Sequence, residues 1–206
     1  LLAVAGLAII LERLWTLWKI RLDIPQFAQQ VFLLIQKGQF QRALERCETV
    51  SHPIADVFKL GILHRALKRE DVDSMMEREG DEQIQYLEQY LGALIIIIGV
   101  EPMLGFLGTI VGLIKAFMAW EELGTNITVS ALAAGIYQAM ITTAGGLIVA
   151  IPYYVIYHLI VGKIKGHAQE MTYYGNELID ILVRPKEGGV RSKLKSIEIH
   201  SSPWNQ

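Results

Sequence analysis

The chain has 206 residues, of which 52% are hydrophobic and 19% charged, and its formal net charge is −2. This composition is more apolar than that of most soluble domains and favours a membrane protein, whereas the charge argues against a nucleic-acid partner. A single cysteine, Cys47, excludes an internal disulfide framework. The histidines lack metal-ligand spacing, so neither a metal nor a cofactor is expected.

The first apolar segment runs from Leu1 to Leu11 and is followed by Trp15 and Trp18. This run is about half the length that a membrane helix needs. We expect residues 1–20 to be a first transmembrane helix, truncated at its N-terminus, that leaves the membrane through an aromatic belt. A signal peptide is the alternative, but no basic flank precedes the run and no small-residue cleavage site follows it.

Residues 21–91 are predicted to form a cytoplasmic helical domain. Pro25 and Pro53 can each open a helix, and Gly38 can end the first one. Asp71 is the predicted N-cap of a later helix. Because no proline interrupts residues 72–100, this helix is expected to continue through the second span and to reach about 50 residues.

Two further spans are predicted, at 92–120 and 131–162, each longer than the roughly 20 residues required. Of the 19 lysines and arginines, 18 lie before or after these spans, and the connection 121–130 contains none. The positive-inside rule therefore makes 121–130 a short periplasmic turn. Residues 163–206 are predicted to be a cytoplasmic helix extension and tail.

Small residues recur along the second and third spans. Such residues let helix backbones approach closely in lipid. The predicted helix-packing residues are Gly105, Gly108, Gly112, Gly135, Ala139 and Gly146. For Gly108 and Gly112 packing alone is the favoured interpretation, because their spacing is a common pattern.

The spans also contain uncharged polar side chains. Gln138 and Thr142 lie four residues apart and share a helix face, and an amide in the middle of a span usually faces protein or water. Glu101 lies toward the cytoplasmic end of its span and should face a lumen or an interface, because a carboxylate facing lipid is costly. It can line a cytoplasmic exit or be a paired structural carboxylate, and the sequence leaves both open. Lys115 is expected to extend to the outer surface.

Two segments together carry a family resemblance: residues 102–112 (PMLGFLGTIVG) and residues 135–152 (GIYQAMITTAGGLIVAIP). They resemble two signatures of the MotA/TolQ/ExbB proton-channel superfamily, in its ExbB/TolQ branch. The spacing between the two segments also fits. Their joint occurrence is far more specific than either glycine pattern.

The resemblance implies an all-α integral membrane protein with three transmembrane helices, two of them extended into a cytoplasmic helical bundle. It implies a homopentameric ring in the bacterial inner membrane, around a partner dimer of ExbD/TolR type with single transmembrane helices. A TonB/TolA-like protein and membrane lipids are further expected partners. Such a protein is not an enzyme.

In the family, proton motive force drives motion of the partner, whose helix holds the proton-binding aspartate. The resemblance makes Thr109 and Thr143 lumen threonines, joined by Thr142, Gln138 and Glu101 in the predicted proton path. Gln138 departs from the family, because better-known members have a glutamate there. A glutamine cannot titrate.

The predicted function is a proton-channel subunit of a TonB- or Tol-type energy-transducing complex. A flagellar stator subunit of MotA type is one alternative, and a non-conducting helical membrane scaffold is another. The process that the complex powers is left open, as is the choice between protons and sodium ions.

Overall fold

The computed structural model describes residues 1–20, 22–123 and 129–183, with side chains except at residues 123 and 129–132. These residues form seven α-helices and no strand. In chain order they are α1 (Leu2–Lys19), α2 (Ile24–Gln36), α3 (Phe40–Glu48), α4 (Pro53–Leu63), α5 (Arg69–Glu88), α6 (Leu91–Leu123) and α7 (Val129–Val183). The predicted all-helical class is confirmed. The chain divides into two compact units, one of residues 1–21 and 83–168, the other of residues 22–82 and 169–206.

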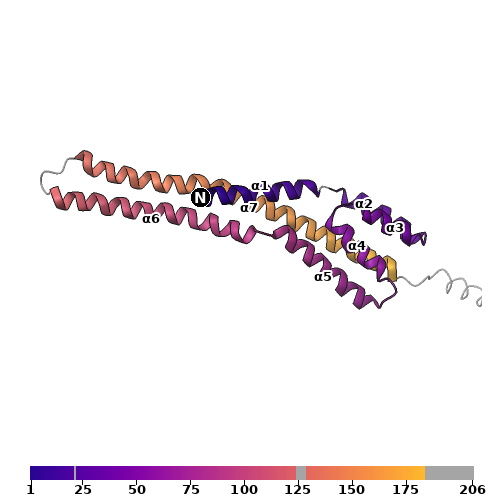
Figure 1. The fold of residues 1–206 in the computed structure, drawn as a ribbon. Coiled ribbons are helices and arrows are strands. Elements are labelled where there is room, and N and C mark those ends of the chain that lie inside the picture. The colour runs from indigo at the N-terminus through magenta and orange to yellow at the C-terminus, as the bar shows by residue number, and fades with distance from the viewer. Residues whose placement is uncertain (21, 124–128, 184–206) are drawn as a thin grey trace, which may run out of the picture. The chain divides into compact units, whose positions relative to one another are not determined.

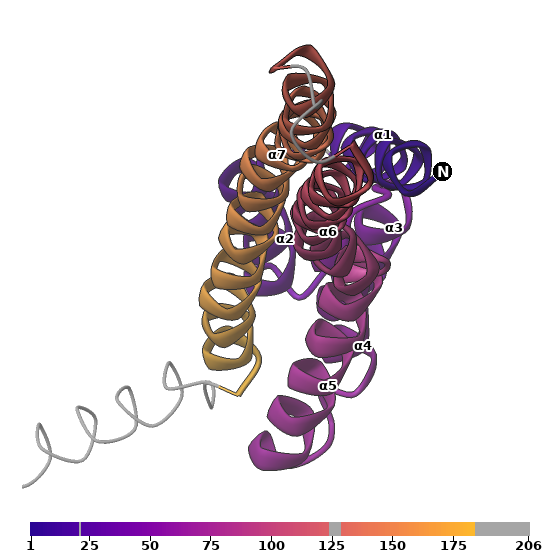
Figure 2. The same cartoon turned by 90° about the vertical axis from the view of Figure 1, so that its left-hand side faces the viewer.

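The first unit contains α1, α6 and the N-terminal part of α7. Figures 1 and 2 show α6 and α7 side by side, with α1 beside α6. Apolar side chains from these helices and from the end of α5 form one buried cluster: Ile10, Leu17, Leu87, Leu91, Leu94, Ile98, Ile160 and Ile164. Pro102 lies inside α6 and Pro152 inside α7. Membrane helices tolerate such prolines where neighbouring groups satisfy the freed carbonyls.

Two helical stretches are long and apolar enough to cross a membrane, within Arg69–Glu122 and within Ala133–Val183. They correspond to the second and third predicted spans. Helix α1 has 18 residues and includes three charges, at Glu12, Arg13 and Lys19. Its assignment as a third span stays a prediction, as does the ring.

The second unit contains α2, α3, α4, most of α5 and the end of α7. The Phe58 ring is fully buried and stacks on Phe27 at 5.8 Å and on Phe32 at 5.7 Å between ring centroids. Helix α2 is capped by Asp23, whose carboxylate accepts a hydrogen bond from the Gln26 N–H at 3.1 Å. Burial of these aromatic rings stabilises the unit.

Three predicted helix boundaries in the second unit agree with the structure. Pro25 lies in the first turn of α2, and Pro53 is the first residue of α4. Gly38 follows α2 with a φ of +73°, in the left-handed region that glycine adopts without steric cost.

The third predicted span also continues without interruption to Val183, as expected.

The predicted helix from Asp71 through the second span is wrong in two respects. Asp71 is not an N-cap, because α5 already begins at Arg69 and Asp71 lies in its first turn. The helix is also interrupted, because α5 ends at Glu88 and α6 begins at Leu91. Between them Tyr90 has a φ of +65°, which no α-helix accommodates.

Candidate functional site

Helices α6 and α7 meet along a seam of small residues. A Cβ atom added to Gly112 would lie 2.8 Å from Ala139 Cβ and 3.1 Å from the Gly135 carbonyl oxygen. One added to Gly135 would lie 2.7 Å from Ala116 Cβ. These separations are shorter than ordinary van der Waals contact, so the two backbones can approach this closely only because the side chains are absent.

The same seam continues toward the other end of α6. A Cβ atom at Gly108 would lie 2.5 Å from Thr142 Oγ1, and one at Gly105 would lie 3.0 Å from the Thr142 carbonyl oxygen. One at Gly146 would lie 2.7 Å from the Glu101 carbonyl oxygen. All six glycine and alanine residues predicted to pack the spans therefore lie at the contact between α6 and α7.

Within the seam, Thr109 of α6 and Thr143 of α7 hydrogen-bond to each other through their hydroxyl groups. Thr143 Oγ1 also donates to the Gly105 carbonyl oxygen at 3.0 Å, across the two helices. Thr109 Oγ1 lies 3.4 Å from both the Gly105 and the Ala139 carbonyl oxygens. Both threonines are partly buried.

Each hydroxyl has one proton to donate, so this cluster has two alternative hydrogen-bond arrangements. In one, Thr143 donates to the Gly105 carbonyl and Thr109 donates to Thr143. In the other, Thr109 donates to a backbone carbonyl, that of Gly105 or Ala139, and Thr143 donates to Thr109. The contacts among the two hydroxyl groups and the two carbonyl oxygens permit both arrangements. A hydroxyl pair of this kind can pass a proton along a chain without being ionised itself.

Beside the hydroxyl pair, a groove of about 280 Å³ brings Gln138 and Thr142 of α7 together with Lys115 of α6. Its other lining residues are Leu104, Leu107, Gly108, Val111 and Gly112. The shared face predicted for Gln138 and Thr142 is therefore present. Among the described residues that line the groove there is one cationic side chain and no carboxylate. Lys115 lines the same groove as Gln138. The sequence did not predict this, because we expected Lys115 to extend toward the outer surface.

Glu101 lies apart from the threonine pair, in a second groove of about 510 Å³ that Thr142, Gly145 and Gly146 also line. The residue is buried, with 8% of its surface exposed. Its Oε2 atom has no hydrogen-bond partner within the described residues. An unpartnered buried carboxylate oxygen is costly, so this group needs water, a cation or a donor from another chain.

Sequence reasoning missed the role of Arg13. Its side chain is 2% exposed and is paired with the Glu12 carboxylate. Its Nη1 donates to the carbonyl oxygens of Tyr86 at 2.9 Å and Leu87 at 3.3 Å. These carbonyls belong to the last turn of α5, where the regular helical hydrogen bonds end. The Tyr86 carbonyl oxygen also accepts a long hydrogen bond from the Gln89 N–H at 3.4 Å. The one signal in the sequence was a pair of opposite charges directly after an apolar run.

The first unit thus pairs two long apolar helices through a glycine seam that contains hydroxyl groups, an arrangement typical of helices that pack within a membrane. The sequence profile of the MotA/TolQ/ExbB proton channel family matches residues 49–172. The chain therefore belongs to the MotA/TolQ/ExbB proton channel family, and within it to the ExbB/TolQ-like branch. Proteins of this family are channels and transducers and not enzymes.

Individual relatives agree with this assignment. The chain is 32% identical over 203 residues to a biopolymer transport protein ExbB homologue of Methanothermobacter thermautotrophicus. That alignment covers 95% of this chain and 71% of the relative. It is 32% identical over 108 residues to the Tol-Pal system protein TolQ of Haemophilus influenzae. That alignment covers 52% of this chain and 47% of the relative. It is 25% identical over 181 residues to the biopolymer transport protein ExbB of Pseudomonas putida. That alignment covers 81% of this chain and 55% of the relative.

Proposed function

We propose that this chain is the proton-conducting subunit of an inner-membrane complex that uses proton motive force to drive an ExbD/TolR-like partner with a single transmembrane helix. Membership in the proton channel family supports an energy-transducing channel subunit. The observation that carries the finer proposal is the hydroxyl pair of Thr109 and Thr143, which joins the two apolar helices at the seam.

In this proposal the proton path follows the face of α6 and α7 that carries the hydroxyl pair, with Gln138 and Thr142 in the adjacent groove. Glu101 lines the cytoplasmic end, where its free oxygen can receive a cation or a donor. None of the hydroxyl or amide groups ionises at physiological pH. The group that binds and releases the proton in mid-membrane is therefore supplied by the partner.

The assembly proposed is a homopentameric ring around a partner dimer, in which α1, α6 and α7 are the three transmembrane helices. Residues 92–120 and 131–162 cross the membrane, and 1–20 is the remaining span. Residues 121–130 lie in the periplasm, whereas 21–91 and 163–206 lie in the cytoplasm. A TonB- or TolA-like protein would receive the force and carry it toward the outer membrane.

The test is proton flux into proteoliposomes that contain the chain with its co-purified partner under an imposed potential. Thr109→Val and Thr143→Val keep the side-chain shape but remove the hydroxyl. We expect each variant to lower the proton flux at least tenfold. The reason is that each loses roughly 1.5 kcal/mol or more of hydrogen bonding to the moving proton, which corresponds to about a factor of ten.

Thr16→Val is the matched control, because Thr16 is a partly buried threonine of α1, as the seam threonines are, but lies outside the seam. Its flux should equal that of the unchanged chain. Unchanged flux in both seam variants would exclude the hydroxyl pair from the path. No flux from the unchanged complex, together with no pH-dependent motion of the partner, would favour a non-conducting scaffold.

A further inference from the structure

A large cleft lies between α1 and α7, away from the seam of α6 and α7. Its volume is about 770 Å³. The cleft is lined by Leu14, Trp15, Leu17, Trp18, His158, Leu159, Ile160, Gly162 and Lys163. All nine residues belong to the first unit.

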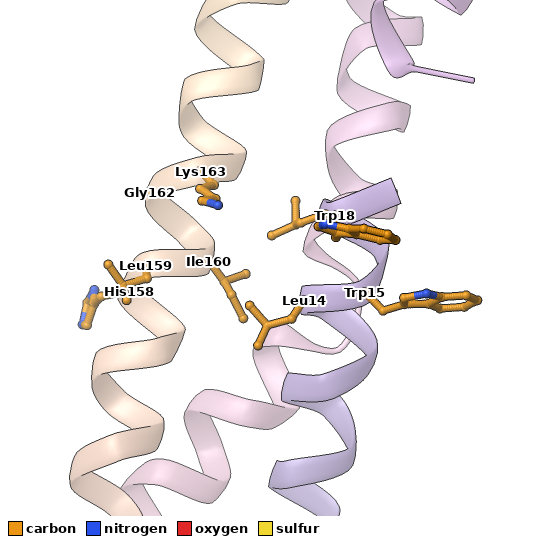
Figure 3. Close-up of a pocket in the computed structure, with 9 residues that line it drawn as sticks. Leu14, Trp15, Trp18, His158, Leu159, Ile160, Gly162 and Lys163 are labelled. Carbon is orange, nitrogen blue, oxygen red and sulfur yellow. The ribbon is translucent and has the colours of Figure 1, made fainter. Parts of the chain in front are cut away.

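The cleft has an apolar base and an open apolar rim. Leu17 and Ile160 at its base are 7% and 1% exposed, whereas Leu14 and Leu159 at its rim are 45% and 65% exposed. Figure 3 shows Leu14 and Ile160 between the two helices at one end of the cleft. An apolar recess of this size in a membrane protein is filled by hydrocarbon, either from a lipid or from another helix.

The other end of the cleft is cationic. Lys163 and Trp18 lie there, roughly one turn from Ile160 and Leu14, as Figure 3 shows. No carboxylate lines the cleft, and Lys163 has no ion-pair partner within the described residues. Tryptophan indoles settle at the level of lipid headgroups, so Trp18 places this end at the membrane surface.

From this combination we propose that the cleft is a binding site for an anionic phospholipid. An acyl chain lies against Leu14, Leu17 and Ile160, and the headgroup phosphate pairs with the Lys163 ammonium. A helix of a second copy is the less favourable occupant, because it would cover an ammonium for which the cleft offers no counter-charge. A phosphate at the headgroup level supplies that charge while remaining hydrated.

The test is native mass spectrometry of the full purified chain in detergent micelles doped with phosphatidylglycerol or with phosphatidylcholine. We expect the unchanged chain to retain phosphatidylglycerol in preference to phosphatidylcholine. Lys163→Gln should lower phosphatidylglycerol retention roughly fivefold, the factor that corresponds to about 1 kcal/mol for one lysine at an anionic headgroup. Lys165→Gln is the control, because Lys165 is exposed but does not line the cleft.

A second variant probes the apolar part. Leu159→Trp adds bulk at an exposed position of the rim and should lower the retention of both lipids. Equal retention by the Lys163 and Lys165 variants, together with unchanged retention in the Leu159 variant, would overturn the proposal. It would also be overturned if Leu159→Trp changed the number of copies in the assembly and left lipid retention unchanged, since the cleft would then be a contact between copies.

Discussion

The residues of the candidate site are uncharged where the helices are closest and charged only in the grooves beside them. Thr109 and Thr143 lie at the seam, whereas Lys115 and Glu101 line separate grooves. The two threonines were predicted from the resemblance of residues 102–112 and 135–152 to the family signatures, since a threonine alone in a span can bond its own helix backbone. Their direct contact depends on the rotation of each helix about its axis, which hydropathy does not define. The same holds for Lys115 and Gln138.

Neighbouring glycines of α7 offer a matched test of the seam. A Cβ atom at Gly146 would lie 2.7 Å from the Glu101 backbone carbonyl, whereas one at Gly145 has nothing within 4 Å. Gly146→Ala should therefore lower the free energy of unfolding by roughly 1–3 kcal/mol, the usual cost of overpacking. Gly145→Ala should leave it unchanged or raise it slightly, because alanine favours the helix.

The measurement is reversible unfolding of the detergent-solubilised chain, followed by circular dichroism. Comparable destabilisation by the two alanines would mean that the backbone of α7 does not approach α6 as closely as the structure shows. A larger loss in the Gly145 variant would contradict the seam outright.

At the scale of the elements, the long helix α7 was predictable and the break between α5 and α6 was not. Helix α7 continues because an apolar run without a strong stop signal leads into an amphipathic one. The break lies at Gln89 and Tyr90, and neither position is a proline or a glycine that would have predicted it. A positive φ at a tyrosine costs free energy of order 1–3 kcal/mol, so tertiary contacts must hold it.

Arg13 supplies one of those contacts, because its guanidinium binds the last carbonyls of α5. Arg13→Met should destabilise the first unit by roughly 2–3 kcal/mol, through the loss of the hydrogen bonds to the Tyr86 and Leu87 carbonyls. The Tyr86 carbonyl would keep only the long bond from the Gln89 N–H. The stability of Arg13→Lys should lie between those of the unchanged chain and Arg13→Met. An ammonium keeps the charge, but it lacks the separate nitrogens with which Arg13 binds the two carbonyls through Nη1 and the Glu12 carboxylate through Nε and Nη2.

Arg78→Met is the comparison variant, because Arg78 is an exposed arginine of the adjoining helix α5. Thermal unfolding and hydrogen exchange of the amides of residues 86–94 provide the measurements. If Arg13→Met left both unchanged, the guanidinium would not be what stabilises the break.

At the scale of the whole molecule, the sequence motifs and charge distribution predicted the class and the family. The number of copies and the partner depend on surfaces that only the assembly brings together, so a single chain does not define them. The orientation in the membrane is a prediction from the basic residues alone. It can be tested directly on the chain.

Cysteine labelling provides that test, and the native cysteine does not interfere. Cys47 is 3% exposed, and burial raises the pKa of its thiol to about 12, so it stays protonated and unreactive at neutral pH. Its reaction should accelerate only as the pH rises toward that value. With a membrane-impermeant maleimide on intact cells, Glu122→Cys should be labelled and Lys165→Cys should not.

Permeabilised cells are the control, in which both introduced cysteines should react and Cys47 should still not react until denaturant is added. Labelling of the Lys165 variant alone would invert the proposed orientation. Labelling of both variants in intact cells would mean that α7 does not cross the membrane.

The contact of Gly112 and Gly135 with the alanines opposite has an electrical consequence. A position only 2.7 or 2.8 Å from the opposite Cβ atom is too close for a water oxygen as well as for a methyl group, so water does not enter between α6 and α7 along this part of the seam. In the proposed channel the seam is therefore insulating, and the current is restricted to the polar face beside it. A bulky residue that forced the helices apart would cost more than stability: it would dissipate the gradient without performing work.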